Sequence, residues 1–298
     1  MSISPSYVYV NGEYLRADAP AVGASDRGLL YGDGLFETLR AYDGVPFLLD
    51  EHLARLNASA TVLRLGNGVD PAAIRIAVTE LLHRNCLQDA YLRITLTRGA
   101  HTGQLDLAPP SRPTLTIVAR PHHPLPPSRY DPGSTAIIAS IRQNADSPLP
   151  RHKTLNYLAN LWARAEARER GADDAILLNT RGEVAEATSS NLFLVASGTI
   201  VTPSLEANIL PGITRAVVLA LARRAGYNVS ERVVRPDELC AADELFLTNS
   251  VGELVPIRAI EGRSVGQGRP GEVTCGLHRS YRDCVRTHIL SGQRAATT

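Results

Sequence analysis

Lysine is the residue that this sequence almost lacks. Lysine and arginine together number 31 in 298 residues, and Lys153 is the single lysine among them. An arginine guanidinium does not deprotonate in proteins, whereas a lysine amine can lose its proton and attack a carbonyl. Arginine supplies positive charge at every other basic position, so the one lysine is a candidate nucleophile. The alternative interpretation is that Lys153 is a leftover surface residue.

Long apolar runs, basic runs and metal-ligand spacings are also missing. No segment reaches the roughly 18 continuous apolar residues of a membrane span, and the start "MSISPSYVYV" lacks the features of a secretory signal. A net charge of +1 without a basic run gives no electrostatic footprint for nucleic acid or an anionic membrane. The four cysteines lie apart, which predicts reduced thiols and no metal site. We therefore expect a cytoplasmic protein that binds neither nucleic acid nor membrane.

Turn signals and periodicity predict two α+β lobes. Asn-Gly at 11–12 and Asp-Gly at 43–44 predict β-hairpins, and helices are expected over 50–65 and 71–85, the second with Asp70 as N-cap. Five prolines within 120–133 resist both helix and sheet. We expect a small N-terminal domain, a linker and a large C-terminal domain, with the bounds 1–121, 122–133 and 134–298.

The second lobe is expected to contain one helix directly after Lys153. Apolar residues recur there at helical spacing, and this stripe should anchor the helix: Leu155, Leu158, Trp162 and Ala165. The remaining expected elements are strands over 134–142, 191–203 and 242–250, a hairpin over 175–187, and helices over 210–226 and 272–289.

Three segments offer what a Schiff-base lysine would need around pyridoxal phosphate. A lysine amine with its ordinary pKa of about 10.4 is charged at neutral pH unless it is desolvated, lies near positive charge or has condensed with a carbonyl. Pyridoxal phosphate would also need a phosphate cradle and a partner for its ring nitrogen. The helix start at 212–214 suits a phosphate, Glu186 suits the nitrogen, and Thr248, Asn249 and Ser250 follow an apolar strand. Taken alone, the first segment is more typical of an ordinary helix start, and the other two are as compatible with an exposed edge residue and a simple turn.

Six motifs in order resemble one enzyme family. They are "SDRGLLYGDGLFETLR", "DEHLARL", "HKTLNYLANL", "GEVAEATSSNLFLV", "LPGITR" and "ELFLTNSVGELVPI". Together they closely resemble the fold-type IV pyridoxal-phosphate enzymes, or class IV aminotransferases. The resemblance implies an α+β fold of two domains, a small α/β lobe and a larger lobe with a barrel-like sheet. It implies pyridoxal 5'-phosphate as cofactor, Lys153 as its Schiff-base residue and proton shuttle, Glu186 at the ring nitrogen, Tyr157 near the phenolic oxygen, and a phosphate site of Arg55, Ile213, Thr214, Asn249 and Ser250.

The resemblance gives mixed signals about the substrate. Residues that match the substrate pocket of branched-chain aminotransferases are Tyr31, Phe36, Tyr91 and Arg93. Thr38 stands where those enzymes usually have glycine, and it matches a proton-relaying threonine of aminodeoxychorismate lyases. After "LTRG" the arginine of the D-amino-acid and lyase branches is missing, although Arg98 or His101 could bind a carboxylate in its place.

The resemblance implies ping-pong transfer of an amino group between a small aliphatic amino acid, with branched-chain L-amino acids first in order, and 2-oxoglutarate. Homodimers are the expected assembly, and the expected ligands are amino acids and keto acids. Aminodeoxychorismate lyase and D-amino-acid or amine transaminase are the alternatives. A non-catalytic two-lobe binding protein is the alternative of a different class. The joint presence of Lys153, Glu186 and Arg55 argues against it.

Overall fold

The structure is a computed structural model that describes residues 6–19, 21–100, 103, 105–108, 110 and 112–297, with side chains up to 293. The chain forms two compact units. Unit 1 comprises the residues up to His123, the segment His152–Asn156 and the residues from Thr287, and unit 2 comprises Pro124–Arg151 and Tyr157–Arg286. Among the helices of the described residues, none combines the length and apolarity that crossing a membrane requires.

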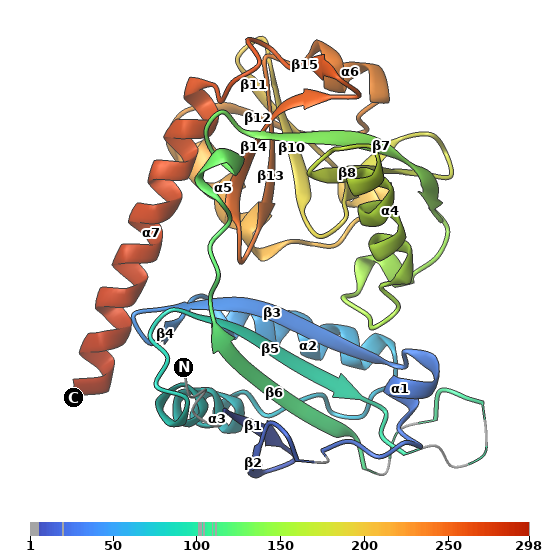
Figure 1. Ribbon diagram of the computed structural model, residues 1–298, viewed down its shortest axis with the longest axis vertical. Helices are drawn as coiled ribbons and strands as arrows, with labels where there is room; N and C mark the ends of the chain where they lie inside the picture. The colour runs from blue at the N-terminus through green and yellow to red at the C-terminus, as the bar shows by residue number, and fades with distance from the viewer. Residues whose placement is uncertain are drawn as a thin grey trace. The chain divides into compact units, whose positions relative to one another are not determined.

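Unit 1 is an antiparallel sheet with two helices on one face. Its strand order is β2-β1-β6-β5-β3-β4, and α2 runs alongside β3 (Figure 1). The elements are β1 (Tyr7–Val10), β2 (Glu13–Arg16), α1 (Arg27–Tyr31), β3 (Gly34–Tyr42), β4 (Val45–Pro46), α2 (Leu49–Val62), α3 (Pro71–Arg84), β5 (Ala90–Thr97) and β6 (Thr114–Pro121). Both predicted hairpins are confirmed, with Asn11 and Asp43 at φ 48° in their turns. The predicted cap is also confirmed, because the Asp70 carboxylate accepts from the Ala72 N–H.

The alternation of side chains along β3 and β5 gives the unit 1 sheet two different faces. Leu39, Leu92 and Ile94 are fully buried in one core with α2 and α3. Successive strand residues point to opposite faces. Phe36 and Arg93 therefore lie on the face away from these helices, together with Thr38, which pairs with Arg93, and Tyr91.

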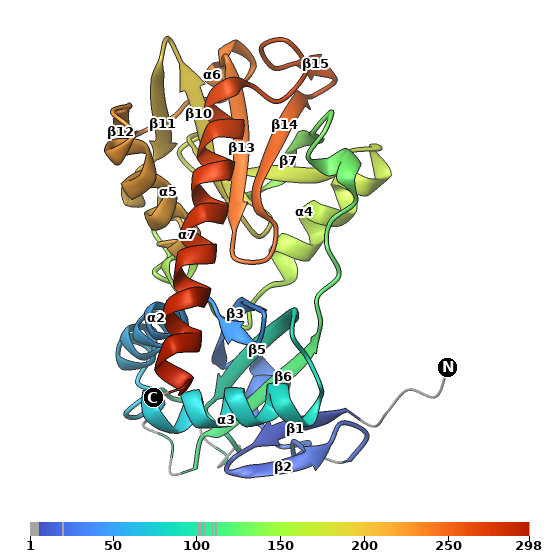
Figure 2. The same cartoon turned by 90° about the vertical axis from the view of Figure 1, so that its left-hand side faces the viewer.

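Unit 2 is a mixed sheet that curls back on itself. The strand order is β12-β11-β10-β13-β14-β7-β8-β9, and β9 at its end lies close to β10 and β11. Figure 2 shows α5 beside β12. The predicted α+β class with a barrel-like larger sheet is confirmed. The elements are η1 (Pro127–Arg129), β7 (Ser134–Gln143), η2 (Leu149–Arg151), α4 (Leu158–Glu169), β8 (Asp174–Asn179), β9 (Val184–Ala187), β10 (Asn191–Ala196), β11 (Thr199–Pro203), η3 (Leu205–Ala207), α5 (Ile213–Arg224), β12 (Asn228–Arg232), α6 (Pro236–Ala241), β13 (Glu244–Asn249), β14 (Glu253–Ile260), β15 (Arg263–Ser264) and α7 (Glu272–Thr297).

Three expectations for the second lobe were wrong in detail. The single strand expected over 191–203 is the hairpin β10–β11, which turns at Ser197 (φ 48°) and Gly198 (φ 76°). Helix α7 extends to Thr297, beyond the expected end. The apolar stripe of α4 does not anchor the helix, because Ala163 and Ala167 are its buried residues and Trp162 is 63% exposed.

Candidate active site

Lys153 lies in an extended segment that is hydrogen-bonded to the edge of β3. The Phe36 N–H donates to the Lys153 carbonyl at 2.8 Å, and the Leu155 N–H donates to the Gly34 carbonyl at 3.0 Å. A Cβ on Gly34 would lie only 2.6 Å from the Leu96 carbonyl oxygen, so the close approach of these strands requires glycine. The backbone of the single lysine is therefore fixed on unit 1.

The lysine amine shares an aromatic ring with a second cation. The Lys153 Nζ lies 4.4 Å from the centroid of Phe36, and the Arg93 guanidinium carbon lies 3.8 Å from the same centroid. Phe36 is buried, and the negative face of an aromatic ring attracts cations. Because Thr38 and Tyr91 share this face of the sheet, four of the predicted substrate residues lie together on one face of unit 1.

On the helical side of β3, Arg55 belongs to a buried ionic cluster. Its Nε and Nη2 donate to the two carboxylate oxygens of Glu37 at 2.8 and 2.6 Å, and His52 Nδ1 lies 2.7 Å from Glu37 Oε2. Burial raises the pKa of Glu37, but the charge and hydrogen bonds of Arg55 and the hydrogen bond of His52 outweigh it and lower the pKa to about 2. Burial lowers the pKa of His52, and the charges of Arg55 and Lys153 lower it further against the opposing effect of Glu37. Glu37 is therefore ionised and His52 neutral near pH 7, and a neutral His52 donates its Nδ1–H to Glu37.

Arg98 is engaged in unit 1 itself. Its side chain is 4% exposed, and its guanidinium donates to both oxygens of Asp33 and to the backbone carbonyls of Leu63, Arg64 and Ala108. These contacts hold the end of β5 against the segment before β6. A role of Arg98 in binding substrate stays a prediction. Tyr31 ends α1 and is 46% exposed, and His101 lies outside the described residues.

In unit 2, Glu186 lies on β9 and is held by Asn191 of β10. The Asn191 amide donates to Glu186 Oε2 at 3.3 Å and to the Leu210 carbonyl at 2.9 Å, and the Leu210 N–H donates to the same Glu186 oxygen at 3.3 Å. The carboxylate is thus oriented by a side chain and by the backbone before α5. Tyr157 is the N-cap residue of α4 in the same unit.

The start of α5 suits a phosphate group. Gly212 is the N-cap residue, and as a glycine it has no side chain to accept from the N–H groups of the first turn. A Cβ on Gly212 would lie 1.9 Å from the Asn191 amide oxygen, so a side chain cannot be placed there. Thr214 Oγ1 lies 3.5 Å from Ser250 Oγ, which brings two hydroxyl groups to this helix end. The N–H groups of the first turn, the positive end of the helix dipole and hydroxyl donors together match a phosphate dianion.

Sequence reasoning missed the residues that orient the predicted ones. Glu37 and His52 orient Arg55, Asn191 orients Glu186, and Ser190 accepts from the Asn249 amide at 2.8 Å. One signal was available in "HLAR", where residues three apart in a helix share a face. The partners across strands have no comparable signal, because their spacing in the sequence is set by the fold.

Comparison with known proteins places this geometry in a family. The family model "Amino-transferase class IV" matches residues 34–260. The chain is 40% identical to a putative branched-chain-amino-acid aminotransferase of Methanocaldococcus jannaschii, over 94% of this chain and 96% of that protein. It is 33% identical to a D-alanine aminotransferase of Bacillus licheniformis, over 93% and 96%. It superposes with a TM-score of 0.86 and 30% identity on a branched-chain amino acid aminotransferase of T.th. complexed with N-(5'-phosphopyridoxyl)-L-glutamate, covering 96% of both chains.

Proposed function

Because the chain belongs to the class IV aminotransferases, we propose that it is a pyridoxal-phosphate enzyme that transfers an amino group between a branched-chain L-amino acid and 2-oxoglutarate. The observation that carries the proposal is the placement of Lys153, the single lysine, against the ring of Phe36, which Arg93 also contacts. The start of α5, with glycine at its N-cap, and the oriented Glu186 carboxylate fit the phosphate and the ring of the cofactor.

Each predicted site residue has one role in this proposal. When bound, pyridoxal phosphate supplies an aldehyde that condenses with amines and a ring that withdraws electrons from the α carbon of the substrate. Lys153 would supply the resident amine and would move the α proton of the substrate. Glu186 would keep a proton on the ring nitrogen, and Tyr157 would contact the phenolic oxygen. The phosphate would be bound by Arg55, Ile213, Thr214, Asn249 and Ser250.

The substrate is bound on the face of the unit 1 sheet that points away from α2 and α3. Arg93 offers a guanidinium for a carboxylate, and the rings of Phe36 and Tyr91 offer apolar surface for an aliphatic side chain. Tyr31 and Thr38 complete the set of proposed substrate residues, whereas Arg98, predicted from the sequence for the same role, is proposed to act through its contacts within unit 1.

An assay with three amino donors tests the proposal. L-leucine, D-alanine and aminodeoxychorismate are each incubated with the loaded enzyme, and glutamate formation from 2-oxoglutarate and pyruvate release are measured. We expect glutamate only with L-leucine. D-amino-acid transamination is the second candidate, favoured by the likeness to a D-alanine aminotransferase, and glutamate from D-alanine alone would select it. Pyruvate release from aminodeoxychorismate would select the lyase, the alternative that the presence of Thr38 supports.

We propose a homodimer as the working form. Three large apolar side chains on α4 are strongly exposed in the single chain: Leu158, Leu161 and Trp162. Exposed apolar patches mark association surfaces, and in a two-fold dimer the same patch serves both copies. The four cysteines are free thiols, which supports a reducing cytoplasm as the place of action.

A further inference from the structure

Glu253 follows the turn 249–252 and combines burial with an unusual backbone conformation. The residue is 4% exposed, and its φ of 60° lies in the left-handed region. Residues other than glycine persist in that region only where the surrounding structure holds them, and such positions cluster at functional sites.

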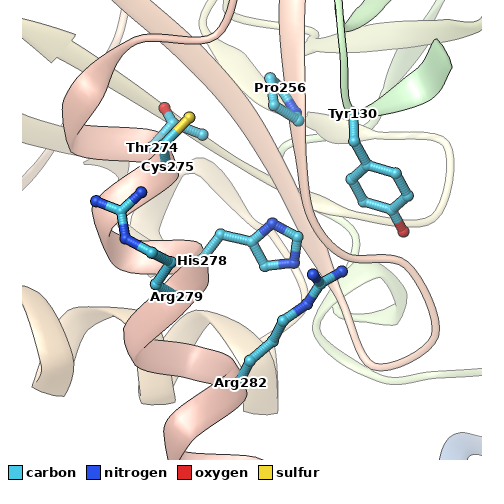
Figure 3. Close-up of a pocket in the computed structure, with 7 residues that line it drawn as sticks. All are labelled: Tyr130, Pro256, Thr274, Cys275, His278, Arg279 and Arg282. Carbon is cyan, nitrogen blue, oxygen red and sulfur yellow. The ribbon is translucent and has the colours of Figure 1, made fainter. Parts of the chain in front are cut away.

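Helix α7 supplies the contacts that hold this carboxylate. His278 Nε2 lies 2.7 Å from Glu253 Oε2, and Arg282 Nε donates to the same oxygen at 2.9 Å. Burial raises the pKa of Glu253, but the hydrogen bonds and charges of His278 and Arg282 outweigh it and lower the pKa to about 2. The carboxylate is therefore charged throughout the neutral range. Figure 3 shows His278 reaching from α7 toward Tyr130, with the Arg282 guanidinium beside it.

Tyr130 joins the turn to the same histidine. Its hydroxyl donates to the Gly252 carbonyl at 3.0 Å, and its ring stacks on His278 with centroids 5.6 Å apart. The side chains drawn in Figure 3 line a hollow of about 170 Å³ at this point of α7. Alongside this hollow, the contacts of His278 and Arg282 with Glu253 connect the helix with the turn.

The other end of the turn is fixed within the candidate site. The Asn249 amide oxygen accepts from the Val251 and Gly252 N–H groups at 2.9 and 2.6 Å, which sets the shape of the turn. Ser250 Oγ lies 3.5 Å from Thr214 Oγ1 at the start of α5. The turn is thus held at one end by groups of the phosphate cradle and at the other by α7.

We propose that Glu253 is a positioning residue which, through His278 and Arg282 of α7, fixes the turn 249–252 as one wall of the phosphate cup. The inference rests on the proposed function and extends it, because it makes α7 part of the cofactor site. Glu253 itself touches neither substrate nor cofactor in this role. Its loss weakens recognition of the phosphate and leaves recognition of the pyridoxal ring unchanged.

Binding of two cofactor forms to the full-length apoprotein tests this role. The dissociation constants of pyridoxal phosphate and of pyridoxal, which lacks the phosphate, are measured from the visible absorbance of the bound ligand. For Glu253→Gln we expect about tenfold weaker binding of pyridoxal phosphate and less than about twofold change for pyridoxal, a tenfold change being 1.4 kcal/mol. Asp283→Asn is the matched control on α7, because Asp283 pairs with Arg286 on the exposed surface, and it should change neither constant.

Two outcomes would overturn the inference. Equal losses of affinity for both ligands would mean that Glu253 supports unit 2 in general. Unchanged affinity for both would mean that the turn 249–252 keeps its shape without Glu253. If Glu253→Gln does not fold, Arg282→Gln replaces it, because Arg282 is exposed and leaves His278 on Glu253; we expect about a threefold selective loss for the phosphate form. Wild-type protein that binds no pyridoxal phosphate would instead refute the proposed function.

Discussion

The backbone N–H of Phe36 donates to the carbonyl of Lys153, and the ring of the same Phe36 lies under the lysine amine. One residue of β3 thus fixes both the main chain and the side chain of the single lysine. The adjacent residue, Glu37, points to the other face of the sheet and orients Arg55. Two neighbours in one strand therefore position the amine and a phosphate-binding candidate.

Replacing Glu186 with glutamine should separate catalysis from cofactor binding. Glutamine keeps the size of the side chain and a hydrogen-bond acceptor for Asn191, but it cannot keep a proton on the ring nitrogen. We expect the turnover number to fall on the order of a hundredfold, while the dissociation constant of pyridoxal phosphate changes little. Both are measured on the same preparation, with Glu183→Gln on the same hairpin as control. Equal losses in rate and affinity would make Glu186 a structural residue.

The Glu37 cluster should make stability depend on pH in acid. The pKa of Glu37 is lowered from 4.5 to about 2, so its contribution is fully present above about pH 4.5 and is lost as the pH falls through 2. The shift corresponds to about 3 kcal/mol. Urea unfolding should show Glu37→Gln less stable than the wild type by roughly this amount at pH 7 and by less than half of it at pH 3. A difference that is the same at both pH values would contradict an ionised Glu37.

Local signals predicted most of the elements, and they failed where distant segments meet. Asn-Gly, Asp-Gly and the Asp70 cap depend on neighbouring residues, so hairpins and α3 were predictable. The apolar stripe of α4 had the right period, but periodicity does not reveal whether a face packs inside its own chain or remains for another molecule. The pairing of the Lys153 segment with β3 links residues more than a hundred positions apart, and no local pattern announces it.

Replacing Arg98 with lysine tests whether its contacts within unit 1 are its main role. Lysine keeps the charge but cannot reproduce the paired contact with Asp33 and the bonds to three carbonyls. We expect a loss of about 2 kcal/mol or more in the free energy of unfolding and little change in KM for 2-oxoglutarate. Arg93→Lys, on the face of the sheet that points away from α2 and α3, is the comparison. This variant should raise KM for 2-oxoglutarate instead. A raised KM with unchanged stability would assign Arg98 to the substrate.

Introducing a charge on α4 should disturb the proposed dimer. Trp162 is 63% exposed in the single chain, and a glutamate there would place a carboxylate in the apolar patch. Sedimentation velocity should show the wild type as a dimer and Trp162→Glu as a monomer over the same micromolar range. Circular dichroism should be unchanged, since the buried residues of α4 are Ala163 and Ala167. A wild type that sediments as a monomer would contradict the proposal.

The single lysine makes the central claim directly measurable. Purified protein loaded with pyridoxal phosphate is reduced with borohydride, digested and analysed by mass spectrometry, with Lys153→Ala treated in parallel. The proposed function requires a pyridoxyl adduct on Lys153, loss of the yellow colour on reduction, and no adduct or multiple turnover in Lys153→Ala. A Lys153 that remains unmodified after reduction, or a Lys153→Ala variant that still turns over repeatedly, would contradict it.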